Sequence, residues 1–208
     1  MSGFWLATAF DIDGVLAHTD YTMVEVANNV FGLNLELEKW IRFKMEESFG
    51  LPKEMVRKII DISLSRENAN KIPINEEGVT TLEELSKELN ITIPLITSRK
   101  KFEDTEYFLD NYVVRGRFDY VLRTKIEGYT TPEQKVENMI DLYCTALVDD
   151  GPENCKEIKN TKVYNLISIM YSARYNQHVD KSYYTVKTNN WKEIKNLVIT
   201  IEELLRGC

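Results

Sequence analysis

Two aspartates, Asp11 and Asp13, stand two residues apart directly after an apolar run at residues 4–9. The run predicts a buried strand, and Gly14 allows a sharp turn after it. Side chains two residues apart on an extended segment point to the same side, so we expect the two carboxylates to lie together. Such a pair needs a cation, which predicts a site for a divalent metal and a phosphate. The simpler alternative is a strand followed by an Asp-Gly turn.

Further residues that suit phosphoryl chemistry follow in order along the chain. They are Thr97, Ser98 and Arg99 after a second apolar run, Lys135 near the start of a predicted helix, and Asp149 and Asp150 after a third apolar run. Alone, Thr97 would be an ordinary β-branched strand residue and Lys135 a solvated helix charge. Their shared order along the chain favours a common site.

Each residue type has a physical part in phosphoryl transfer. An aspartate nucleophile divides hydrolysis into two steps through an aspartyl-phosphate. The Thr97 hydroxyl would lie at a strand end, where open α/β sheets bind their ligands. Lys135 offers positive charge to the phosphate, and Asp149 offers an oxygen ligand to Mg²⁺.

These motifs resemble those of the haloacid dehalogenase-like (HAD) superfamily of phosphohydrolases, whose first motif is Asp-x-Asp-Gly. The resemblance implies that Asp11 is the nucleophile and Asp13 the acid and base, with Thr97 and Lys135 completing the catalytic set. It also implies a Mg²⁺ ion held by Asp11, the Asp13 backbone carbonyl and Asp149, with Asp150 as a further ligand or support.

Two lysines compete for the catalytic position. Lys135 follows Thr131, Pro132 and Gln134, which we interpret as the N-cap, first and third positions of a helix. The helix dipole and the lysine would then both favour an anion. Lys125, in a loop after a predicted strand at residues 118–122, is the rival. We prefer Lys135 because it lies one helix before the acidic strand, as in the HAD pattern.

The expected fold is a three-layer, Rossmann-like α/β core with a parallel sheet and a small helical cap inserted after the first strand. We assign residues 1–17 and 72–208 to the core and residues 18–71 to the cap. In the core we expect helices at 102–114 and 132–143, strands at 118–122, 145–148 and 162–167, and a last helix from residues 190–191.

The segment 18–71 has helical periodicity throughout. Gly32 is expected to end the first helix, a second helix is expected at residues 35–49 before Gly50, and a third from Pro52. An all-helical insert here resembles the C1-type cap of the superfamily, which excludes water and selects the leaving group. Trp40 and Phe43 are our candidates for contacting a substrate base.

Composition is that of a compact enzyme. The chain has 208 residues, 43% hydrophobic residues and a net charge of −7, which argues against a nucleic-acid-coating surface. No apolar run is long enough for a membrane span, and no signal-peptide pattern is visible. Three cysteines without paired spacing predict free thiols and a cytoplasmic protein, namely Cys144, Cys155 and Cys208. We expect neither a nucleic-acid nor a membrane partner, and a homodimer is compatible with the sequence.

The C-terminal third gives a narrower resemblance. A loop at residues 170–177 and the sequence Asn189-Asn190-Trp191 are similar to the tail of the 5′(3′)-deoxyribonucleotidase family. Two positions depart from that family, because Arg99 stands where Pro is frequent and Gly151 where a basic residue is frequent. The resemblance implies a Mg²⁺-dependent phosphomonoesterase for (deoxy)nucleoside monophosphates.

Alternative functions are a phosphatase for a sugar phosphate or another small phosphorylated metabolite, a phosphomutase, and a binding or regulatory protein without catalysis. Arg99 bears on this choice. It would bind a second charged group of the substrate, together with contacts from Thr97 and Ser98, or it would be an exposed arginine near the following helix. His18 is interpreted as a loop histidine.

Overall fold

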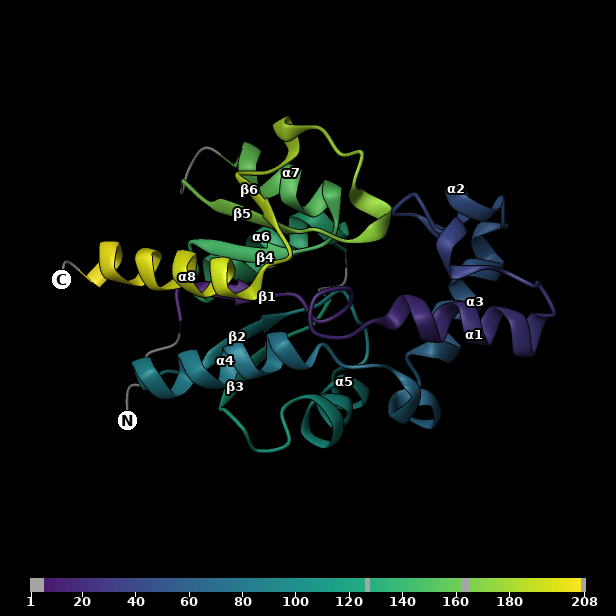
Figure 1. Cartoon of the computed structure of the whole chain (residues 1–208), viewed down its shortest axis with the longest axis horizontal. Coiled ribbons are helices and arrows are strands. Elements are labelled where there is room, and N and C mark those ends of the chain that lie inside the picture. The colour runs from purple at the N-terminus through teal and green to yellow at the C-terminus, as the bar shows by residue number, and fades with distance from the viewer. Residues whose placement is uncertain (1–5, 126–127, 162–164, 207–208) are drawn as a thin grey trace.

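A six-stranded, wholly parallel sheet runs through the centre of the molecule (Figure 1). The computed structural model describes residues 6–125, 128–161 and 165–206. The strand order across the sheet is β3-β2-β1-β4-β5-β6. The strands are β1 (Thr8–Phe10), β2 (Ile93–Ile96), β3 (Tyr120–Arg123), β4 (Ala146–Asp149), β5 (Ile167–Tyr171) and β6 (Val186–Thr188).

Helices cover both faces of this sheet, because its central strands are apolar on both sides. Phe10, Leu95 and Val148 pack on one face, against α4 (Glu76–Leu89), α5 (Phe102–Phe108) and α8 (Trp191–Arg206). The strand residues that alternate with these, among them Ala9 and Leu147, pack on the other face against α6 (Thr131–Asp141) and α7 (Pro152–Asn160). The predicted three-layer Rossmann-like core is confirmed.

The insert between β1 and α4 is helical and forms a hydrophobic cluster of its own. It contains α1 (Thr19–Phe31), α2 (Met45–Phe49) and α3 (Lys53–Ser63), with the short 3-10 helices η1 (Leu37–Lys39) and η2 (Arg66–Lys71). Figure 1 shows α1, α2 and α3 grouped at the end of the molecule opposite the two termini. Its cluster includes Trp40, Met45 and Ile59, and one residue from far along the chain, Tyr175. The boundary at residues 18–71 stays a prediction.

The second helix of this insert differs from the prediction. The expected helix at residues 35–49 is replaced by η1, an irregular stretch and the short α2. Side chains take over backbone hydrogen bonds here. The Asn28 amide bonds both the N–H and the C=O of Leu35, and the Ser48 hydroxyl does the same for Arg42. Gly32 and Gly50 end α1 and α2 in the left-handed conformation, as predicted for helix ends.

Other boundaries moved by a few residues. The expected helix at 102–114 is α5 followed by a π-helical turn at Leu109–Val113. The predicted strand at 162–167 begins outside the described residues, and β5 starts at Ile167. Neither α7 nor β6 was predicted, because α7 is mostly polar and β6 has only three residues. Within the described residues, no helix is long and apolar enough to cross a membrane.

Candidate active site

The sheet order brings two acidic chain segments together. Strands β1 and β4 are neighbours, with Phe10 beside Val148, although β2 and β3 lie between them in the sequence. The order of the strands therefore reverses at β1, and ligands of open α/β sheets bind at such a point. Asp11 follows β1 and donates its backbone N–H to the Val148 carbonyl at 2.9 Å. Asp149 ends β4, so both carboxylates reach the same edge.

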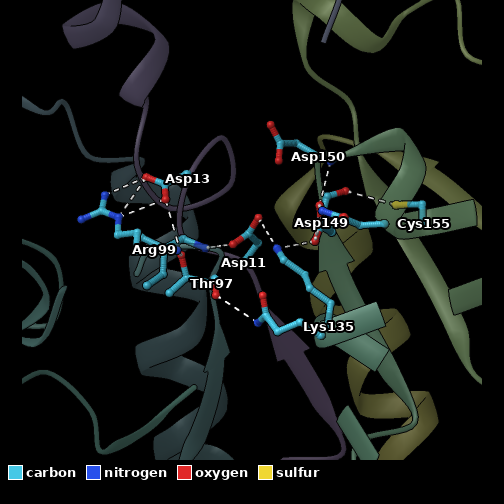
Figure 2. Close-up of polar contacts among 12 residues, drawn as sticks. Asp11, Asp13, Thr97, Arg99, Lys135, Asp149, Asp150 and Cys155 are labelled. Atoms are coloured by element: carbon cyan, nitrogen blue, oxygen red, sulfur yellow. Dashed lines mark hydrogen bonds and ion pairs between the residues drawn. The ribbon is translucent and has the colours of Figure 1, made fainter. Parts of the chain in front are cut away.

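Lys135 joins these two carboxylates. Its Nζ lies 2.6 Å from Asp11 Oδ2 and 2.6 Å from Asp149 Oδ2, and its side chain is fully buried (Figure 2). The rival Lys125 is half-buried in the loop after β3, where its backbone N–H bonds the Arg99 carbonyl. Of the two candidates, Lys135 is the one that contacts Asp11.

The start of α6 differs by one residue from the prediction. Thr130, not Thr131, is the N-cap, and it forms a capping box with Glu133 rather than with Gln134. The Gln134 side chain is buried and donates to the Thr97 carbonyl at 3.3 Å. Because α6 begins one residue earlier than predicted, Lys135 lies one position further from the helix N-terminus. Its side chain extends into the core toward the acidic residues.

Burial and mutual repulsion raise the pKa values of the carboxylic acids here. The pKa of Asp11 is raised to about 7. Burial is the main cause, Lys135 opposes it, and the charges of Asp149 and Asp13 add to the rise. Burial and the neighbouring Asp149 and Asp11 likewise hold the pKa of Asp150 well above its usual range. Burial lowers the pKa of Lys135, but the charges of Asp11 and Asp149 raise it more, so it remains an ammonium.

The three buried aspartates form a site that could hold a metal ion. Asp11, Asp149 and Asp150 offer oxygens that all lie within 4.8 Å of one another. The Lys135 ammonium neutralises one of their charges. Carboxylate oxygens are the ligands that Mg²⁺ and Ca²⁺ prefer in proteins, so the donor set suits a hard divalent cation.

Groups that the sequence did not predict hold these aspartates in place. The Asn154 amide donates to both Asp149 oxygens, at 3.1 and 3.2 Å. The Tyr175 hydroxyl donates to Asp150 Oδ2, and the Asn176 amide donates to the Asp150 carbonyl at 2.9 Å. Asn176 lies in the tail that resembles the nucleotidases, so a signal for it existed. Tyr175 lies in the same loop, but the resemblance singled out no role for it, and Asn154 lies in the unpredicted α7.

Gly14 is required by this packing. It has a φ of +80°, and a Cβ atom at this position would lie 1.9 Å from Asp150 Oδ2 and 2.6 Å from the Tyr175 hydroxyl. Only glycine fits both the backbone conformation and the space. The Asp-Gly turn is therefore part of the acidic site.

The two aspartates of the first motif diverge, contrary to the prediction that they lie together. Asp11 points toward Lys135, whereas Asp13 points toward the end of β2 (Figure 2). Arg99 donates to Asp13 from Nη2 at 2.7 Å and from Nε at 3.0 Å. The Thr97 hydroxyl is 3.5 Å from Asp13 Oδ2. The divergence arises because Asp13 lies beyond β1, in the turn that pairs it with Ala17.

Arg99 is not the exposed arginine that one interpretation predicted. The residue is only 5% exposed, and its guanidinium lies over the Phe108 ring, 4.4 Å from the centroid. Arg99 and the half-buried Ser98 both line the cleft above the site. Thr97 is fully buried next to this cleft.

This cleft has a volume of about 590 Å³ and lies between the core and the helical insert. Asp11, Asp13 and Asp150 line it from the core. Trp40 and Phe43 line it from the insert, and their ring centroids lie 6.0 and 5.9 Å from that of Tyr175. The structure thus brings the two predicted aromatic residues to the same cleft as the acidic site.

His18, Cys144 and Cys155 are not among the residues that line the cleft. The His18 ring contacts Tyr21. The Cys155 thiol lies 3.5 Å from the Asp149 carbonyl oxygen, but burial raises its pKa well above the usual range, which disfavours the reactive thiolate. Cys144 is buried in the core, and Cys208 lies outside the described residues.

Comparison with known proteins gives a family and a fold. A sequence profile of the family described as 5′ nucleotidase, deoxy (pyrimidine), cytosolic type C matches residues 6–204. No curated protein sequence matches this chain.

Several solved structures share the fold at low sequence identity. A haloacid dehalogenase-like hydrolase from Streptococcus pneumoniae has a TM-score of 0.67 at 13% identity, over 93% of this chain and 98% of that one. Protein tyrosine kinase A of Mycobacterium tuberculosis has a TM-score of 0.66 at 13% identity, over 95% and 99%. A predicted phosphoglycolate phosphatase from Haemophilus somnus has a TM-score of 0.63 at 13% identity, over 93% and 97%.

These structures are described with different activities, so they establish the fold alone. The family profile covers nearly the whole sequence and includes all four motifs. The chain therefore belongs to the 5′ nucleotidase, deoxy (pyrimidine), cytosolic type C family of phosphoric monoester hydrolases, and it shares its fold with haloacid dehalogenase-like hydrolases.

Proposed function

We propose that this protein is a Mg²⁺-dependent 5′-nucleotidase that hydrolyses (deoxy)nucleoside monophosphates through an aspartyl-phosphate. The observation that carries the proposal is the buried Asp11–Lys135–Asp149 set, of which Asp11 lines a cleft with aromatic residues in its wall. The family match supports the same reaction class, because its description names a 5′ nucleotidase.

Each residue has a role in this proposal. Asp11 attacks the phosphorus, held by its contact with Lys135, whose charge also attracts the phosphoryl oxygens. Asp13 lines the cleft, protonates the leaving oxygen and then accepts a proton from the water that hydrolyses the aspartyl-phosphate. The Thr97 hydroxyl donates a hydrogen bond to the phosphoryl group.

The residues present fit the proposed metal. Among the described residues, three buried carboxylates meet one ammonium, and the raised pKa values of Asp11 and Asp150 indicate that cationic charge is insufficient there. Asp11, Asp149 and Asp150 would hold Mg²⁺ together with the Asp13 backbone carbonyl. When bound, the ion would neutralise phosphate charge during transfer. Asn154 and Tyr175 orient the ligand carboxylates.

The cleft favours a nucleotide over other phosphate esters. Phe43 and Trp40 offer ring surfaces beside the acidic site, and stacking of a base on an aromatic ring is worth roughly 1–3 kcal/mol. Arg99 is the residue that would bind a second anionic group, but two of its nitrogens are already bonded to Asp13. This pairing argues against a doubly charged sugar phosphate.

Phosphate release across a panel of substrates tests the proposal. The panel holds ribo- and deoxynucleoside 5′-monophosphates, sugar phosphates and p-nitrophenyl phosphate, each with Mg²⁺ and with EDTA. We expect the highest kcat/KM for a nucleotide and no turnover with EDTA. A sugar phosphate that exceeds every nucleotide would overturn the substrate assignment.

The covalent step has its own test. Asp11→Asn should abolish turnover, whereas Asp61→Asn, at an exposed position of α3, should not. Asp13→Asn should slow hydrolysis of the aspartyl-phosphate, so acid quenching after addition of radiolabelled substrate should trap label on the protein. Wild-type rates in Asp11→Asn would refute the covalent mechanism.

A further inference from the structure

The Arg99 guanidinium occupies an enclosed position between a carboxylate and an aromatic ring. Its Nη2 and Nε bond the two oxygens of Asp13, at 2.7 and 3.0 Å, and the Phe108 ring lies 4.4 Å from its central carbon. The side chain is 4% exposed. A charge buried this deeply is stable only with a well-aligned partner, and Asp13 is that partner.

The backbone around Arg99 is fixed as firmly as its side chain. Its N–H donates to the Thr97 hydroxyl at 3.2 Å, and its carbonyl accepts from the Lys125 N–H at 3.0 Å. Arg99 thus belongs to the rigid loop at the end of β2. A group held on this loop can impose a position on a partner from another strand.

Asp13 is the less constrained member of the pair. Its side chain is 25% exposed and follows the short turn that pairs Asp13 with Ala17. Besides the Arg99 contacts, its described side-chain bond is the long one from the Thr97 hydroxyl, at 3.5 Å. The orientation of the Asp13 carboxylate therefore depends chiefly on Arg99.

We propose that Arg99 is a positioning residue that fixes the Asp13 carboxylate at the cleft wall, on the side away from Lys135, where it serves the leaving group and the attacking water. The proposal rests on the proposed function, in which Asp13 is the acid and base. A carboxylate has about four acceptor sites, so a two-point contact with Arg99 leaves others facing the cleft. The planar fork of arginine fixes a carboxylate plane in a way that lysine does not.

This role predicts a dependence on the leaving group. In p-nitrophenyl phosphate, the p-nitrophenolate leaves with little need of a proton. In phenyl phosphate, the more basic phenolate needs a proton from the general acid Asp13. Both esters carry one phosphate and no other charge. Loosening Asp13 should therefore reduce kcat/KM for phenyl phosphate more than for p-nitrophenyl phosphate, because general acid catalysis contributes roughly 10²–10⁴-fold.

The experiment measures kcat/KM for both esters in the wild type, Arg99→Gln, Arg99→Lys, Asp13→Asn and the Asp13→Asn/Arg99→Gln double variant. We expect the phenyl to p-nitrophenyl ratio to fall about ten-fold or more in Arg99→Gln. Arg99→Lys should lie between it and the wild type. In the Asp13→Asn background, Arg99→Gln should have little further effect, because Arg99 acts through Asp13.

Arg66→Gln is the matched control. Arg66 also pairs with an aspartate, Asp104 at 2.6 Å, and also lies over an aromatic ring, that of Tyr107 at 5.2 Å, but it does not line the cleft. Its ratio should equal that of the wild type. Thermal unfolding of every variant identifies those that fold, and if Arg99→Gln does not, the ratio in Arg99→Lys decides.

Several results would overturn this role. Equal losses for both esters, or an undiminished effect of Arg99→Gln in the Asp13→Asn background, would show that Arg99 acts otherwise. Unchanged kcat/KM for both esters in Arg99→Gln would also overturn it, and a loss found only when a substrate with a second anionic group is added to the series would assign Arg99 to substrate binding. A gain in turnover would show that Arg99 restrains Asp13 from acting. No turnover in the wild type would instead refute the proposed function itself.

Discussion

Replacement of Lys135 by methionine tests how the acidic site is held together. Methionine retains an unbranched apolar chain of similar length and removes only the ammonium. In the wild type, that ammonium is fully buried and lies 2.6 Å from both Asp11 and Asp149. Its removal leaves the buried carboxylates Asp11, Asp149 and Asp150 without this neutralising charge.

The magnitude follows from burial and from the pKa of Asp11. Removing one partner of a buried ion pair destabilises a protein by about 3–5 kcal/mol. Protonation of a carboxylate relieves part of this loss, and burial already raises the pKa of Asp11 to about 7. Lys135 lowers this pKa, so the variant should have an even higher one. A carboxylic acid with a raised folded-state pKa loses stability as pH rises from its unfolded-state pKa of 3.8 up to its folded-state pKa. The loss ends near pH 7 in the wild type but continues above it in the variant, so the destabilisation should grow between about pH 6 and about pH 8.

Urea unfolding in EDTA at these two pH values measures the effect, and a second series with Mg²⁺ measures its rescue. Lys125→Met is the matched control, because Lys125 is half-buried in a loop and contacts Arg99 through its backbone. Its unfolding free energy should change by no more than about 0.5 kcal/mol. A loss below about 1 kcal/mol for Lys135→Met at the higher pH, or a loss that shrinks as pH rises, would refute this account of the site.

Three further perturbations are informative. Gly14→Ala should reduce both the free energy of unfolding and the Mg²⁺ affinity, because a Cβ would lie 1.9 Å from Asp150 Oδ2. Gly32→Ala is the control, because Gly32 also has a positive φ but has open space around it. Urea unfolding of this control should show the backbone strain alone, about 1–2 kcal/mol. The EDTA-treated wild type should lose stability as pH rises toward 7, the pKa of Asp11, and a melting temperature independent of pH would contradict this. Phe43→Ala should raise KM for nucleotides by about ten-fold and for sugar phosphates much less, and equal increases would count against base stacking.

The places of the four motifs on strand ends and on a helix could be predicted from the sequence alone. Each lies at the end of an apolar strand or on a helix with clear start signals, so its location depends on local properties of the chain. Asp11, Thr97 and Asp149 stand at or just after β1, β2 and β4, and Lys135 stands on α6. The parallel sheet then brings these strand ends to one edge, which is why an order of motifs predicts a site.

Contacts between distant segments were not predictable in the same way. The bond from Tyr175 to Asp150 spans 25 residues, and the pairing of Arg99 with Asp13 spans 86. Each depends on the course of a loop that has no periodic pattern. The predicted helix at residues 35–49 failed for a related reason, because Asn28 supplies hydrogen bonds from another helix to Leu35.

The two sides of the site differ in electrical balance, and this difference bears on the roles of the first-motif aspartates. On the β4 side, in the part of the chain that the structure describes, Asp11 and two further buried carboxylates meet the single charge of Lys135. On the β2 side, Asp13 meets the full charge of Arg99. A divalent cation is therefore attracted to the Asp11 side, where charge is lacking. The Asp13 side chain lies outside the carboxylate cluster that would hold the metal, so it is left available for its proposed role at the cleft wall.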